Sequence, residues 1–217
     1  MGAGKTNTGE PEKNNITQGS IFGQLLLFFF PILFGTFFQQ LYNTADAVVV
    51  GHFVGKQALA AVGGTTSTLI NLLVGFFVGL SSGATVVISQ YYGARKPDKV
   101  HWAVHTAVAF SLMGGVLFMV IGIVFAHMAL SAMHTPEDVL NYAVVYIRIY
   151  FLGMIPNLIY NMGAGILRAV GDSKRPLYFL IGSCMVNILL DIILVAGLRM
   201  GVAGAAIATI TSQLFSA

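Results

Sequence analysis

The chain has 217 residues, of which 56% are hydrophobic and 9% are charged, and its formal net charge is +3. With a mean hydropathy of +0.81, it lies outside the range of soluble globular domains, which predicts an integral membrane protein with the lipid bilayer as a partner. The basic residues lie in short loops rather than along one helix face, so no nucleic acid partner is expected. The single cysteine, Cys184, excludes an internal disulfide and a thiolate metal site.

The chain begins with a polar segment and continues as a series of apolar ones. Residues 1–19 have no apolar core, so we expect a disordered tail rather than a signal peptide or a membrane span. Six apolar segments then approach or exceed the roughly 20 residues that a bilayer-spanning helix needs. They run over residues 21–50, 58–91, 100–129, 139–167, 177–198 and 201–216. The predicted fold is an all-α membrane protein whose residues 20–217 form one domain of six transmembrane helices.

The distribution of basic residues predicts how these helices are oriented. If the tail is cytoplasmic, Lys56 and Arg199 are the only basic loop residues on the outer side, and the others fall inside. The positive-inside rule therefore predicts a multi-pass protein of the plasma (inner) membrane with a cytoplasmic N-terminus. The sixth segment is short and stops without a polar flank, which predicts a chain cut from a longer protein.

Two aspartates, Asp46 in the first predicted span and Asp191 in the fifth, are the only acidic residues inside the apolar stretches. A carboxylate in a lipid-spanning helix is costly, so it usually faces a protein-lined cavity and handles ions, protons or cationic cargo. In the predicted orientation both acids lie in the outer half of the membrane at similar depth. These two acids predict ion-coupled transport rather than enzymatic activity.

Helical spacing gives the acids polar neighbours on faces that four spans share. These neighbours are Gln39 beside Asp46, Asn187 beside Asp191, Tyr146 in the fourth span and Thr209 in the sixth. The pattern predicts one pocket lined by four helices. Two structural interpretations stay open. Amides and hydroxyls often tie membrane helices together by hydrogen bonds, and Arg148 in the fourth span is a possible ion-pair partner for Asp191.

Several motifs occur in an order that resembles one transporter family. They are Pro31, residues 39–42 (QQLY), Asp46, residues 58–63 (ALAAVG), 88–90 (ISQ), 167–172 (LRAVGD), Asn187 with Asp191, and residues 201–209 (GVAGAAIAT). This combination resembles the amino-terminal half of the multidrug and toxic compound extrusion (MATE) family. The resemblance implies one six-helix lobe of a two-lobed transporter that exports cationic or amphipathic compounds by antiport with H⁺ or Na⁺.

The resemblance also implies roles for individual residues. It assigns ion coupling to Asp46, Asn187 and Asp191, and supporting roles in the ion site and cavity to Gln39, Tyr146 and Thr209. Pro31 would be the hinge where the first helix bends. No cofactor is expected besides the coupling ion, and a sodium ion would be held by Asp46, Asn187, Asp191 and Thr209. Because the second lobe is absent, the expected partner is a second six-helix lobe or a second copy of the chain.

Other functions remain as alternatives. A lipid-linked precursor flippase of similar topology would need more basic residues in its cleft than Arg148 alone. An intramembrane aspartyl protease would also use two acids, but Leu189 and Leu190 precede Asp191 where that class has a G-x-G-D context. A non-transporting fragment or an assembly subunit is the remaining possibility.

Overall fold

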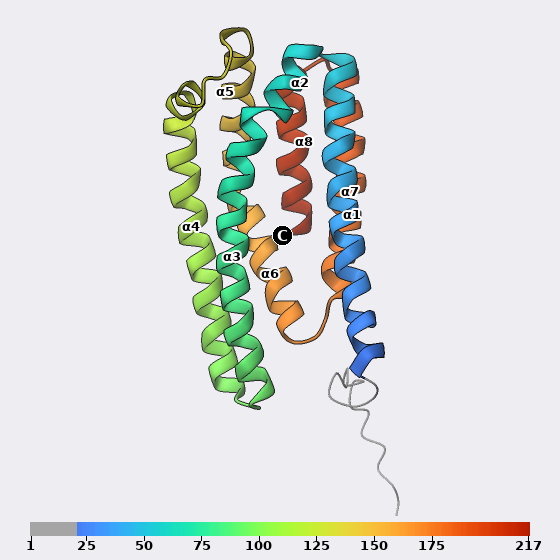
Figure 1. The fold of residues 1–217 in the computed structure, drawn as a ribbon, viewed down its shortest axis with the longest axis vertical. Helices are drawn as coiled ribbons and strands as arrows, with labels where there is room; N and C mark the ends of the chain where they lie inside the picture. The colour runs from blue at the N-terminus through green and yellow to red at the C-terminus, as the bar shows by residue number, and fades with distance from the viewer. Residues whose placement is uncertain (1–20) are drawn as a thin grey trace, which may run out of the picture.

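The computed structural model describes residues 21–217, which form a bundle of helices that run side by side (Figure 1). The predicted tail, residues 1–19, lies outside the described residues. The elements in chain order are α1 (Ile21–Phe53), α2 (Lys56–Gly63), α3 (Thr65–Gly93), α4 (Pro97–Ala132), α5 (Glu137–Leu152), α6 (Met154–Ala169), α7 (Lys174–Asp191), a π-helical turn η1 (Ile192–Gly197) and α8 (Gly201–Ser216). The predicted all-α membrane fold is confirmed.

The predicted spans correspond to continuous or interrupted helices. Within residues 21–217, four stretches are long and apolar enough to cross a membrane, and the bent pair α5 and α6 makes a fifth if it is one span. The sixth, α8, is apolar but has 16 residues. Large apolar side chains are exposed on the outside of the bundle, for example Leu72, Val124 and Leu189. This surface suits contact with lipid, because acyl chains are as apolar as these side chains.

Two of the spans are interrupted at glycines, and at both positions a larger residue would clash with neighbouring atoms. The second predicted span is α2 followed by α3, which part at Gly64, where a β-carbon would overlap the carbonyl oxygen of Ala60. The fourth is α5 followed by α6, which meet at Gly153 with a bend of 53°. Here a β-carbon would collide with Ile210 of α8. The bend thus lets α8 approach the middle of this broken span.

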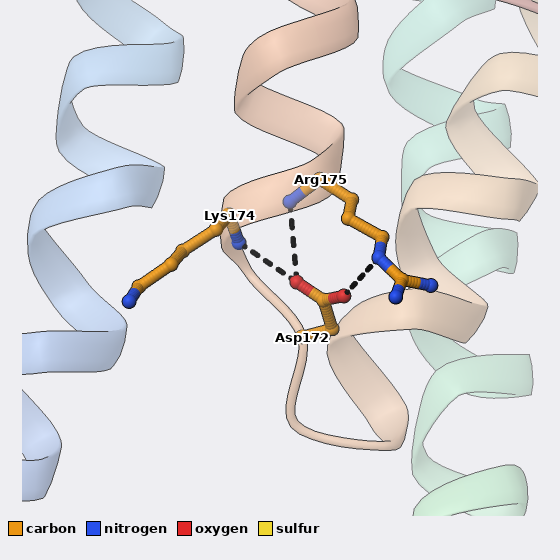
Figure 2. A network of polar contacts seen from close by, with 3 residues as sticks. All are labelled: Asp172, Lys174 and Arg175. Atoms are coloured by element: carbon orange, nitrogen blue, oxygen red, sulfur yellow. Dashed lines mark hydrogen bonds and ion pairs between the residues drawn. The ribbon is translucent and has the colours of Figure 1, made fainter. Parts of the chain in front are cut away.

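The turn between α6 and α7 is fixed by one aspartate (Figure 2). Asp172 Oδ1 accepts hydrogen bonds from the backbone N–H groups of Lys174 and Arg175, each at 3.1 Å. Its Oδ2 lies 3.0 Å from Nε of Arg175. The carboxylate therefore satisfies backbone donors at the start of α7 and suits the positive end of the helix dipole. This sets where α7 begins, and so the depth at which Asn187 and Asp191 lie.

The core of the bundle has two main parts. One lies between α3, α4, α5 and α6 and includes Phe77, Leu130 and Phe151, with Gly122 of α4 placed directly against the Phe151 ring. The other lies between α1, α2, α5 and α8 and includes Val50 and Ala205. This second part packs around the buried acidic residues and supports the candidate site.

Candidate functional site

Three helices bring the predicted ion-coupling residues together. Asp46 comes from α1, Asn187 and Asp191 from α7, and Thr209 from α8, and their side chains are at most 4% exposed. Asn187 and Asp191 both lie next to the Asp46 carboxylate. The cluster joins residues that are as many as 163 positions apart in the sequence. The structure therefore places these four side chains in one buried group.

The hydroxyl of Thr209 is the described hydrogen-bond partner of Asp46. Thr209 Oγ1 lies 3.2 Å from Asp46 Oδ2 and 3.0 Å from the carbonyl oxygen of Ala205. A hydroxyl has one proton to donate, so it can serve only one of these acceptors at a time. Thr209 can thus donate to an ionised Asp46, or accept from a protonated Asp46 while donating to Ala205.

The remaining polar atoms of the cluster have no hydrogen-bond partner among residues 21–217. They are Asp46 Oδ1, both carboxylate oxygens of Asp191, and both polar atoms of the Asn187 amide. Buried polar atoms of this kind are costly unless they are satisfied, the oxygens by a proton, a cation or water, and the amide nitrogen of Asn187 by an acceptor. Their oxygen atoms, with that of Thr209, make a donor set suited to a hard cation such as Na⁺ or to a proton.

The ion pair considered for Asp191 is not formed. Arg148 is exposed on α5, and the ion pair found within the described residues joins Arg175 to Asp172 in the α6–α7 turn. Asp191 is fully buried without a cationic side chain at contact distance in this part of the chain. A structural salt bridge therefore does not account for the buried acid.

A cavity of about 460 Å³ adjoins the buried cluster. Asp46 lines this cavity, whereas Asn187, Asp191 and Thr209 lie behind it and are at most 1% exposed. Pro31, Gln39 and Tyr146 also line it, and the rings of Tyr146 and Tyr150 are stacked with centroids 6.3 Å apart. Asp46 is thus the residue through which a group in the cavity reaches the buried cluster.

Some of the polar side chains on these helix faces form hydrogen bonds within the bundle, as the structural interpretation predicted. Ser183 donates to the carbonyl oxygen of Ser212 at 2.8 Å and ties α7 to α8. Asn161 donates to the backbone and side-chain oxygens of Asn157 within α6. These amides and hydroxyls stabilise the bundle. Asp46 also accepts one interhelical hydrogen bond, from Thr209, but its Oδ1 and both carboxylate oxygens of Asp191 have no partner among residues 21–217, which separates the acids from the helix-linking groups.

Two cavity residues were missed when the sequence was considered alone. Gln213 lines the cavity, and its Oε1 is buried without a partner within the described residues. Arg168 also lines the cavity, although it was counted as a loop residue. Helical spacing contains both signals, because Gln213 follows Thr209 by four positions and Arg168 follows Asn161 by seven.

Comparison with known proteins places the chain in a family. The family model MatE matches residues 31–193. The chain belongs to the MATE family. It is 34% identical over 199 residues to the probable multidrug resistance protein YoeA of Bacillus subtilis, covering 90% of this chain and 43% of YoeA.

Solved MATE structures share this fold. A MATE transporter in the bent conformation matches with a TM-score of 0.84 and 28% identity, over 91% of this chain and 44% of that one. A MATE transporter in the straight conformation matches with a TM-score of 0.86 and 27% identity, over 94% of this chain and 45% of that one. The chain thus spans less than half the length of these relatives, and MATE family members are transporters rather than enzymes.

We predict that Asp191→Asn stabilises the folded chain. The substitution replaces an unpaired buried carboxyl group with a neutral amide, which cannot add a second charge beside Asp46 and can donate to the Asp46 carboxylate without binding a proton. The expected gain is about 1–3 kcal/mol, seen as an apparent unfolding temperature several degrees higher by circular dichroism in detergent at neutral pH.

Asp172→Asn is the matched control, because it weakens the contacts at the start of α7 and should lower stability slightly. A loss of about 3–5 kcal/mol in Asp191→Asn, the usual result of breaking a buried ion pair, would contradict this account and indicate a cationic partner for Asp191.

Proposed function

We propose that this chain is the ion-coupling lobe of a cation-coupled (H⁺ or Na⁺) antiporter that exports cationic or amphipathic drugs and toxins. The observation that carries the proposal is the position of Asp46. Its side chain lines the cavity and also belongs to the buried cluster with Asn187, Asp191 and Thr209. YoeA, a probable multidrug resistance protein, supports drug export as the activity.

Antiport requires that ion and substrate exclude each other, and the geometry of Asp46 offers a simple cause. An ionised Asp46 attracts a cationic substrate into the cavity, where few water molecules screen the charge. A proton or a sodium ion on the buried cluster neutralises the same carboxylate and removes that attraction. Each ligand therefore weakens the binding of the other by the same factor, as thermodynamic linkage demands.

The cavity lining suits amphipathic cations of varied shape. Tyr42, Tyr146 and Tyr150 line it and provide aromatic faces, on which organic cations bind through the ring quadrupole. The volume of about 460 Å³ lies within the range of small-molecule sites. Arg168 is the basic side chain in the lining, while Arg148 is not part of it. A single arginine in a lining that also contains Asp46 favours drug export over the flippase alternative.

A hinge at Pro31 would let ion binding change the shape of α1. In the structure α1 continues as one helix through Pro31, which lines the cavity. Proline lacks the N–H that would bond to the carbonyl of Leu27, so bending here breaks no hydrogen bond. MATE relatives occur in a bent and a straight conformation. We propose that charge neutralisation at Asp46 shifts α1 between two such shapes and displaces the substrate.

The proposed transporter needs a second wall for its cleft. The relatives are more than twice as long as this chain. We propose that a second six-helix lobe, or a second copy of this chain, faces the cavity. The site would then lie in a multi-pass protein of the plasma (inner) membrane with a cytoplasmic N-terminus.

We predict that Asp46→Asn abolishes coupled export. Proteoliposomes holding the complete gene product that contains this chain would be loaded with a fluorescent cationic dye, and a pH gradient or a sodium gradient would be imposed separately. The neutral amide can neither attract the dye nor exchange a proton, so dye movement should fall to that of protein-free vesicles under either gradient. Glu137→Gln, at the start of α5, should leave export unchanged. Normal ion-driven export by Asp46→Asn would refute the proposal.

Substitutions of Thr209 should identify the coupling ion. A sodium ion needs neutral oxygen ligands beside the acids, whereas a proton needs only a carboxylate. If sodium is the ion, Thr209→Val should raise the sodium concentration for half-maximal export about tenfold, the equivalent of about 1.4 kcal/mol, and Thr209→Ser should stay near the wild type. If protons are the ion, both variants should keep export driven by the pH gradient. A tenfold loss in Thr209→Ser would contradict a role for the hydroxyl alone.

We predict that Pro31→Ala slows export without weakening substrate binding. Alanine restores the missing backbone donor and favours one straight helix. The dye dissociation constant, measured by fluorescence anisotropy in detergent, should change less than about threefold, under about 0.7 kcal/mol, while the export rate should fall clearly. An unchanged rate would show that α1 does not bend at Pro31 during transport.

A further inference from the structure

A second concave surface lies outside the candidate site, between α3 and α4. These two helices pack side by side and join at the turn of residues 94–96, with α6 behind them (Figure 1). A groove of about 640 Å³ runs along them near this turn. Its base includes the buried Ala107 and the buried Met162 of α6. None of its lining residues belongs to the lining of the cavity that contains Asp46.

The body of the groove is apolar and open to the side of the bundle. Small residues, Gly83 and Ala84 on α3 and Ala103 on α4, leave space between the helices. The larger side chains along the groove, including Val87 and Phe110, are 44% and 47% exposed. A flexible hydrocarbon chain can fill such a space and cover these apolar side chains.

One end of the groove is polar and basic. Lys99 and Trp102 lie there, and the Lys99 Nζ sits 5.6 Å from the centroid of the Tyr91 ring. The neighbouring turn adds Arg95 and Lys96, against the single acid Asp98. Within the described residues the ion pair found is that of Arg175 with Asp172. Lys99 therefore has no carboxylate at contact distance there and remains available to an anion.

The depth of this end matches the headgroup region of a bilayer. α4 has 36 residues, and if its midpoint lies at the membrane centre, Trp102 is about 19 Å and Lys99 about 23 Å from that centre. The hydrocarbon edge lies at about 15 Å and the headgroups extend to about 22 Å. The deeper part of the groove, around Ala107 and Phe110, then lies at the level of the acyl chains, and Lys99 lies at the outer edge of the headgroup region.

We propose that this groove is a binding site for an anionic phospholipid of the surrounding membrane. One acyl chain would lie along Gly83, Ala84 and Ala103, and the negatively charged headgroup would contact Lys99. The position of the groove on a membrane-facing surface, and a single cationic end at headgroup depth, favour a lipid over another protein. The proposal does not depend on the transport function.

The only tryptophan of the chain is Trp102, so its fluorescence reports directly on this groove. The chain would be reconstituted in phosphatidylcholine vesicles that contain a low fraction of either brominated phosphatidylglycerol or brominated phosphatidylcholine, whose bromine atoms quench tryptophan on contact. We expect the anionic lipid to quench Trp102 at a lower mole fraction than the zwitterionic lipid, with a preference of up to about fivefold for one lysine.

Matched variants distinguish binding of the anionic lipid in the groove from its general electrostatic attraction to a basic protein. Lys99→Gln should remove the preference, and Lys99→Arg should keep it. Gly83→Leu should fill the groove and reduce quenching by the anionic lipid. Gly79→Leu is its control, because neither glycine has an atom within 4 Å of its β-carbon position but Gly79 does not line the groove. Lys174→Gln, an exposed lysine in the other basic turn, should have no effect.

Three results would overturn the proposal. Equal quenching by the two brominated lipids would show ordinary boundary lipid without selectivity. A preference that survives both Lys99→Gln and Gly83→Leu would place the anionic lipid elsewhere. Absence of quenching by either lipid would show that protein covers the groove, from a second copy or a second lobe.

Discussion

Two carboxylates lie buried between α1, α7 and α8, and the described residues offer them a hydroxyl but no cationic side chain. Such a pair opposes the close approach of the helices, because each charge loses water and repels the other. Other contacts must therefore hold the three helices together. Small residues of α8, such as the fully buried Ala205 and Ala206, allow close packing, and Ser183 ties α7 to α8. The bundle thus stabilises an arrangement that becomes favourable for the acids only when a cation or proton is present.

Two of the spans near this cluster are irregular, although α1, which supplies Asp46, runs as one helix of 33 residues. Directly after Asp191, α7 widens into a π-helical turn, where the N–H of Leu198 bonds to the carbonyl of Ile193, five residues back. Opposite it, the bend at Gly153 brings α6 and α8 together. Such interruptions re-aim side chains within a membrane helix while its backbone groups stay bonded to nearby partners. The π-helical turn follows Asp191 directly, and the Gly153 bend lies against Ile210 of α8, one residue after Thr209.

The sequence predicted the spans and the acidic pair well because both depend on local properties. Apolar length marks a membrane helix, and a carboxylate within it stands out by its residue type alone. The breaks at Gly64 and Gly153 were not predicted, since they arise from Ala60 and from Ile210 of a different helix. Spacing placed Asn187 beside Asp191 on one face, yet it did not show that Asp191 lacks a partner or that Ser183 on the same helix ties α7 to α8. That distinction depends on what α8 presents to α7, a tertiary contact.

The proposed coupling can be divided between what one lobe supplies and what requires a second. All four oxygen-bearing residues of the cluster come from this chain, although it spans only 43% of the length of YoeA. In the proposed mechanism, binding of the ion and loss of the charge on Asp46 would therefore be local events in one lobe. Exposing the cavity to opposite sides of a membrane is different, because a single wall has no opposing surface against which to open and close. A second lobe would thus add directional access, while the competition between ion and substrate at Asp46 would already be set by the first.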